Sequence, residues 1–371
     1  MVCAKSFGAK DKEKIQKTVH TSLALAVVSG LILAFIGVVF ARPLLQMINT
    51  PADVIDHSVI YMSLIFAGCP FSLVYNFSAG VLRAFGDTKR PLYILSVTGF
   101  VNVLLNLVFV IFLNMAVAGV ALATVISQAL SAGAAVYILM KSDGDIRLDP
   151  KKIKFHKEEL FNIVKIGLPT GLNAVMYNVA NVSLQSSINS FGKEYMAAST
   201  AGSAVASYIN LPEGAFATAV VSFVGQNYGA KKYKRIHKVV GVALLATLLF
   251  SAVPSVFVTV FPKFFLGLFV KEPEVIIKGV GKVIIMGIGY LINIPVAIYG
   301  AALRGIERSN TPTVINLLTI LVSRMAWIYF IFPLHPTFEM LFFCFPVSWI
   351  ISSVALGIAY YLHMKKLISE K

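Results

Sequence analysis

The sequence predicts an all-α polytopic membrane protein with two homologous helical lobes, in which ten transmembrane helices are present of an expected twelve. Three observations support this fold class. Apolar residues make up 57% of the 371 residues, charged residues make up 13%, and mean hydropathy is +0.80, outside the range of a soluble domain of this size. Ten apolar stretches each approach the ~20 residues that cross ~30 Å of hydrocarbon. The chain also resembles itself at an offset of 221 residues, since FGAK at 7–10 recurs as YGAK at 228–231.

Each apolar stretch is expected to be a helix, because a backbone in lipid must satisfy its own hydrogen bonds. In chain order the expected helices are residues 18–41, 57–82, 91–113, 117–140, 160–189, 196–224, 239–261, 276–302, 312–332 and 338–362.

The internal repeat divides these helices into lobes. LRAFGDTKRP at 82–91 recurs as LRGIERSNTP at 303–312 at the same offset. Residues 1–140 form an N-lobe with four visible helices, 141–159 a polar inter-lobe loop, and 160–371 a C-lobe of six. Met1 aligns with Ser222, inside the end of a helix. The chain is therefore expected to lack its first two helices, and a substrate path is expected between the lobes, as in secondary transporters.

The net charge of +15 follows the loops. Most basic residues fall in loops on one side of the predicted membrane, which the positive-inside rule makes cytoplasmic, together with both visible termini. The opposite loops carry Arg42, Lys193, Lys263 and Lys271, with Lys278 and Lys282 close to the last of them. The charge is thus a topology signal, and no nucleic-acid partner is expected.

Catalytic and cofactor chemistry is not predicted. No Ser/His/Asp set, phosphate loop or metal-ligand spacing is present, and the three cysteines suggest neither a metal site nor a disulfide. We expect neither an enzyme nor a cofactor or metal centre.

Polar residues inside the helices are candidate site residues, because each is costly in lipid unless it faces protein or water. Residues spaced by four share one helix face. The helix at 160–189 carries such a stripe, which either lines an aqueous cavity or joins helices: Asn173, Tyr177, Asn181 and Gln185, with Asn178 nearby. A smaller cluster is expected in the N-lobe from Tyr75, Asn76, Asn102 and Asn106.

Only two strongly ionisable residues are assigned to helix interiors, Glu213 and Arg324. Glu213 follows Pro212, which frees a backbone carbonyl one turn earlier and bends the helix. A carboxylate beside such a break is the candidate for binding the coupling ion or a cationic compound. Arg324 is its possible charge partner, or else extends toward the interface.

Several motifs together resemble the multidrug and toxic compound extrusion family. They are GQNYGAKKYKRIHKVV at 225–240, its copy AKSFGAKDKEKIQKTVH at 4–20, the loop LRAFGDTKRP, and AVAGVALATVISQALSAG at 116–133. The resemblance covers essentially the whole chain. It implies a bacterial inner-membrane antiporter, expected to be monomeric, that exports organic cations and other amphipathic compounds in exchange for Na⁺ or H⁺.

The resemblance leaves the coupling ion open. In one sodium-coupled branch the coupling acids are on the seventh and tenth helices, where this chain has Asn173 to Asn181 and Tyr290 with Asn293. In a proton-coupled branch the acid is on the first helix. Two alternatives remain: a lipid-linked oligosaccharide flippase, for which more buried basic residues than Arg324 are expected, and an inactive fragment.

Overall fold

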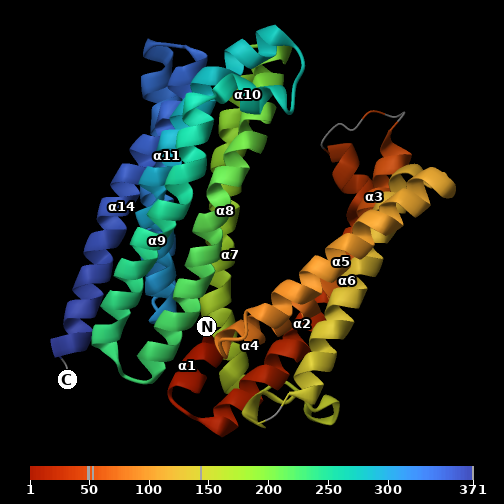
Figure 1. Ribbon diagram of the computed structural model, residues 1–371, viewed down its shortest axis with the longest axis vertical. Coiled ribbons are helices and arrows are strands. Elements are labelled where there is room, and N and C mark those ends of the chain that lie inside the picture. Colours follow the sequence, from red (N-terminus) through yellow and green to blue (C-terminus); the bar gives the residue numbers. More distant parts are fainter. Residues whose placement is uncertain (48–50, 52–53, 143, 370–371) are drawn as a thin grey trace. The chain divides into compact units, whose positions relative to one another are not determined.

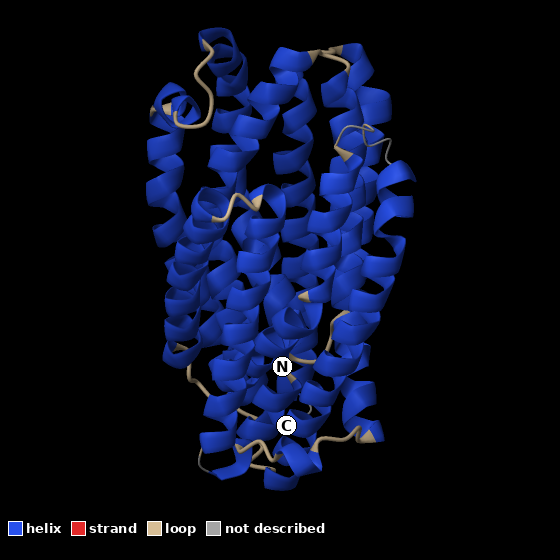
Figure 2. Cartoon of the chain, turned by 90° about the vertical axis from the view of Figure 1, so that its right-hand side faces the viewer, coloured by secondary structure: helices blue, strands red, loops and turns tan. Residues whose placement is uncertain are grey.

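The computed structural model describes residues 1–47, 51, 54–142 and 144–369, and it is helical, with no strand among those residues (Figure 2). A long helix or pair of helices is found at each of the ten predicted segments. They are α2 (Lys12–Met47), α3 (Ile55–Ala67) with α4 (Cys69–Ala84), α5 (Lys89–Leu107) with a π-helical turn (Val108–Phe112), α6 (Ala116–Lys141), α7 (Lys157–Asn189), α8 (Lys193–Gly229), α9 (Tyr233–Val260), α11 (Pro273–Gly305), α12 (Asn310–Asn316) continuing to Leu334, and α14 (Phe338–Ser369).

Most of these helices are suited to a lipid environment. Among the residues that the structure describes, eight helical stretches are long and apolar enough to cross a membrane. The other two long helices, α7 and α8, have 33 and 37 residues and carry more polar side chains. Large apolar side chains such as Phe35, Phe100 and Val242 are about two-thirds exposed, which fits contact with acyl chains and not with water.

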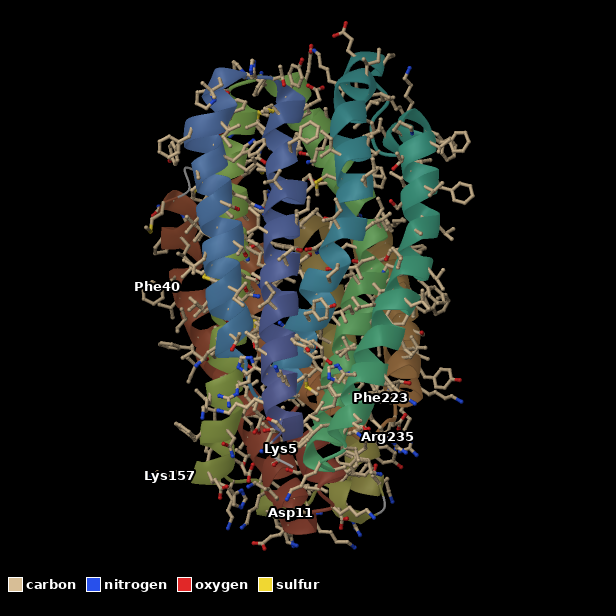
Figure 3. The ribbon with its side chains drawn as sticks, turned by 90° about the vertical axis from the view of Figure 1, so that its left-hand side faces the viewer. Lys5, Asp11, Phe40, Lys157, Phe223 and Arg235 are labelled. Carbon is tan, nitrogen blue, oxygen red and sulfur yellow. The ribbon has the colours of Figure 1, made fainter. Side chains whose placement is uncertain are left out.

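The chain forms two compact units, Val2–Ile163 and Val164–Lys371 (Figure 1). The boundary lies within the first two turns of α7, and the predicted inter-lobe loop belongs to the N-terminal unit. In Figure 3 the labelled charged residues of that unit, Lys5, Asp11 and Lys157, lie at one end of it, whereas Phe40 lies farther along α2 and points outward.

Polar contacts hold the inter-lobe loop against the start of α2. Lys14 Nζ donates to Glu158 Oε1 at 2.9 Å, and Thr18 Oγ1 donates to Glu159 Oε2 at 3.0 Å. The Asp149 amide donates to the His20 ring at 3.1 Å. Because Glu159 is buried and Thr18 is buried against it, this loop is a packed part of the N-terminal unit.

In the C-terminal unit α11 packs against α8, α9 and α14, which run beside it in Figure 1. Small residues permit the close approach. A Cβ at Gly305 would lie 2.6 Å from Val224 Cγ1, and one at Gly289 would lie 2.9 Å from the Trp349 ring.

The predicted repeat is visible in the backbone. Lys10 and Lys231 have φ of 59° and 55°, and Gly86 and Glu307 have φ of 86° and 65°, so left-handed residues recur at the same offset. The hydrogen bond from Asp87 N to Leu82 O, 3.0 Å, recurs from Arg308 N to Leu303 O, 2.9 Å. The two halves therefore share turn geometry even where a glycine has been replaced by glutamate.

Candidate functional site

The C-terminal unit contains a cavity of about 340 Å³ between α7, α8, α11 and α14. Its walls combine amide, hydroxyl and aromatic side chains with one ammonium group. They are Asn181, Leu184, Gln185, Ile188, Ser199, Ser203, Ala206, Ser207, Asn210, Lys282, Met286, Tyr290, Phe342 and Phe345.

Lys282 supplies the charge of this cavity. It is 4% exposed, and its Nζ donates to Ser199 O at 2.6 Å, Ser199 Oγ at 2.8 Å and Ser203 Oγ at 2.7 Å. The Phe342 ring centroid lies 4.7 Å from the same Nζ, a cation–π distance. The aliphatic stem passes Gly202, where a Cβ would lie 3.1 Å from Lys282 Cδ. The missing side chain at Gly202 therefore leaves room for the lysine.

Glu213 lies one helical turn beyond the cavity. Asn210 on α8 and Tyr290 on α11 line one end, and Glu213 and Asn293 follow each of them by three residues. Asn293 Nδ2 donates to Glu213 Oε1 at 2.7 Å, and the carboxylate residue is 7% exposed. The partner of Glu213 is therefore an amide from the next helix and not the guanidinium of Arg324, which the sequence had offered as its possible charge partner.

Among the described residues no acid pairs with Arg324, and its side chain does not extend outward. It is 2% exposed, and no carboxylate in the described part of the chain lies within 4.0 Å of it. Its Nε donates to Ser348 Oγ at 3.2 Å, and its Nη1 donates to Asn181 Oδ1 at a long 3.5 Å. The guanidinium stacks 4.1 Å from the Phe345 ring centroid. Its Nη2 is buried and has no hydrogen-bond partner among the described residues.

The backbone around Arg324 is unusual. The guanidinium residue lies in α13 (Ser323–Ala326), a single α-helical turn between two π-helical segments, Leu317–Val322 and Trp327–Ile331. Such wide turns are rare and are often found at functional sites. They position Arg324 behind Asn181 and Phe345, two residues of the cavity wall.

The polar stripe of α7 is divided between two roles. Asn181 and Gln185 line the cavity. Asn173 Oδ1 accepts from Asn316 Nδ2 at 3.3 Å, and the Tyr177 ring lies 5.9 Å from Arg324 Cζ, so these two join α7 to its neighbour. The fifth predicted member, Asn178, is exposed.

The polar cluster predicted in the N-terminal unit is two separate pairs. Tyr75 is buried and its hydroxyl donates to Pro91 O at 3.1 Å, while Asn76 is exposed and donates to Ser72 O. Asn106 Nδ2 donates to Asn102 Oδ1 at 3.1 Å on α5. Within residues 54–142 no hydrogen bond joins one pair to the other.

Lys282 is the functional candidate that the sequence reading missed, because it was grouped with the loop residues near Lys271. The expectation that Glu213 and Arg324 are the only strongly ionisable residues in helix interiors was wrong, because Lys282 is buried within α11. The signal was available: Lys282 falls inside the apolar stretch 276–302, and an ionisable residue inside such a stretch is a site candidate by default.

Comparisons with known proteins agree on one family. The MatE family model matches residues 1–108 and 169–330. A probable multidrug resistance protein of Bacillus subtilis, YoeA, is 28% identical over 327 residues, which cover 86% of this chain and 71% of that protein. The probable multidrug resistance protein NorM of Thermotoga maritima is 25% identical and has 70% of its length covered.

Solved structures show the same fold. One described as the outward-facing conformation of a multidrug resistance MATE family transporter of the MOP superfamily matches with a TM-score of 0.93. It is 19% identical, and the match covers 99% of this chain and 83% of that one.

Proposed function

We propose a transport function for this chain, which belongs to the MatE family. It is a secondary active antiporter that exports amphipathic organic compounds, organic cations among them, in exchange for Na⁺ or H⁺. Members of this family are membrane transporters and not enzymes. We further propose that exchange with Na⁺ or H⁺ alternates between the two lobes, and that the protein is a monomer of the bacterial inner membrane with both visible termini in the cytoplasm.

The observation that carries the coupling proposal is the buried carboxylate of Glu213. Pro212, inside α8, has no N–H, so the carbonyl of Tyr208 lacks its usual helical partner. Glu213 follows Pro212 directly, and Tyr208 lies about one turn earlier on the same helix. Carboxylate and carbonyl oxygens are ligands for Na⁺, and a carboxylate alone can carry H⁺, so either ion can be exchanged at Glu213.

Efflux from an energised cell tests the proposal. The full-length gene expressed in an efflux-deficient host should lower ethidium accumulation, and collapsing both the sodium and the proton gradient should abolish the effect. Glu213→Gln keeps the size and removes the charge, so export should fall while membrane abundance stays near wild type. Glu339→Gln, at an exposed position on α14, is the matched control and should export normally.

A second function, a lipid-linked oligosaccharide flippase, gains support from the burial of Lys282 and Arg324 in one unit, since a pyrophosphate-linked substrate needs buried cations. Unchanged ethidium accumulation at normal membrane abundance would contradict drug export and favour the flippase or an inactive product. Unchanged export by the Glu213→Gln variant would place coupling elsewhere and move the search to the stripe from Asn173 to Gln185.

A further inference from the structure

We infer that the α7–α8–α11–α14 cavity binds the acidic group of an amphipathic anion at its Lys282 end. This inference rests on the proposed export function and adds an anionic class to its substrates: the ligand carries a carboxylate or phosphate on an apolar body. It assigns a role to Lys282 that differs from the coupling role proposed for Glu213.

The hydrogen-bond partners of the Lys282 ammonium are uncharged. The three hydrogen-bond acceptors of the Lys282 ammonium are a carbonyl and two hydroxyls, all neutral. No carboxylate within the described ranges lies within 4.0 Å of Nζ, and Glu339, whose side chain lies beside the neighbouring Gly281, is exposed. A buried ammonium without a counter-ion is costly, so an anion arriving at this end gains an unneutralised partner.

Glu213 lies far along α8 from the serine that holds Lys282. Ser199, which holds the ammonium, and Glu213 are 14 residues apart on α8, about 21 Å at 1.5 Å per residue. At that separation the carboxylate does little to neutralise the ammonium. The base therefore acts at one end of the cavity, and the acid lies one helical turn beyond the other end.

The two serines beside Lys282 retain hydrogen-bond donors for a ligand. Ser199 Oγ and Ser203 Oγ accept from the ammonium, and each hydroxyl keeps one O–H to donate. Both serines line the cavity. An anion at this end can accept from these polarised hydroxyls without displacing Lys282 from its own partners.

Two aromatic side chains form the cavity wall next to the two buried cations. Phe342 and Phe345 line the cavity beside Lys282 and Arg324 respectively. The aromatic faces fit an apolar body, and the second cation behind the wall repels a positive ligand. A volume of about 340 Å³ is at the small end of drug-sized sites.

Binding to purified full-length protein in nanodiscs tests the inference without any ion gradient. Dansylglycine, a carboxylate, and dansylcholine, a quaternary amine, share one fluorophore. We expect dansylglycine to bind roughly tenfold or more tightly than dansylcholine, the effect of one unit charge several Å away in a partly desolvated site. Equal binding, or a preference for dansylcholine, would overturn the inference and needs no variant that has to fold.

Variants then locate the site. Lys282→Gln should weaken dansylglycine binding about tenfold, Lys282→Arg should retain most of it, and dansylcholine affinity should not fall in either. The matched control is Lys278→Gln. Lys278 lies one turn from Lys282 on α11, carries the same charge, and pairs with Glu194 outside the cavity. Equal effects of Lys278→Gln and Lys282→Gln would refute the assignment.

The anion can be a soluble acid or a lipid headgroup, and nanodisc composition separates them. Equal dansylglycine affinity in phosphatidylcholine discs and in discs containing phosphatidylglycerol supports a soluble acid. Lower affinity in the anionic discs supports a headgroup occupying the same site. Because binding is read without transport, a failure of ethidium export leaves this result intact, and a failure of anion binding leaves the antiport proposal intact.

Discussion

A double-mutant cycle on Glu213 and Asn293 measures how strongly α8 and α11 are joined at the candidate coupling residue. Asn293→Ala removes the donor of a buried 2.7 Å hydrogen bond. It also removes Asn293 Oδ1, which is buried without a partner among the described residues, and this offsets part of the loss. The single variant is therefore ambiguous, whereas the cycle cancels the effect of the orphan oxygen because both arms contain it.

The magnitude follows from charge. A hydrogen bond to an ionised group contributes about 1.5–3 kcal/mol, whereas a neutral bond between membrane helices averages about 0.6 kcal/mol. At alkaline pH, where the Glu213 carboxylate is ionised, Asn293→Ala should therefore cost about 1–2 kcal/mol more free energy of unfolding in the wild type than in the Glu213→Gln background.

Titration with sodium dodecyl sulfate in mixed micelles gives the free energies of unfolding. Intrinsic fluorescence reports on the correct unit, because both tryptophans, Trp327 and Trp349, belong to Val164–Lys371. Additivity of the two substitutions within about 0.5 kcal/mol would refute the reasoning, since it would mean that the Asn293 amide does not sense the charge of Glu213.

Three other predictions concern the N-terminal unit and topology. A reporter active only in the cytoplasm should work when fused after Lys152 and fail after Lys271, and the reverse result would overturn the orientation. Gly86→Ala should destabilise the protein by about 1–2 kcal/mol because φ of 86° is left-handed; a Cβ there meets nothing within 4 Å, so no clash adds to this cost. Gly99 is helical and equally open, so Gly99→Ala should stabilise the protein by about 0.5–1 kcal/mol. Equal shifts of the two variants in a thiol-dye melting assay would contradict this. Burial, followed by nearby positive charges, lowers the pKa of His156 below 6.5. The contribution of the neutral ring to stability is therefore present above pH 6.5 and is lost as the pH falls through the folded-state pKa. In His156→Gln the melting temperature should depend less on pH between 7.5 and 5, and an unchanged pH dependence would refute this.

Much of the fold was predictable because its causes are local and repeated. Apolar length predicts helices wherever lipid excludes water, and all ten predicted segments coincide with helices. The 221-residue offset is recovered in the shared left-handed backbone of two residues as different as Gly86 and Glu307.

The site was less predictable because its contacts join residues distant in sequence. Glu213 was recognisable from Pro212, but its partner Asn293 is 80 residues away, and no pattern in either helix specifies the pairing. Lys282 was not singled out because its position near the start of the apolar stretch 276–302 resembles that of an interface lysine. Only the packing against Ser199, Ser203 and Gly202 shows that it turns inward.

The attachment of the inter-lobe loop to α2 has a mechanical consequence. A flexible polar linker would not transmit a rotation from one unit to the other. Here Thr18, Thr21 and His20 hydrogen-bond to residues between 149 and 159, and α7 crosses the unit boundary as one continuous helix. Any bending of this connection then has to occur within α7 itself, where Gly167, Pro169 and Gly171 are the residues at which a helix bends most readily.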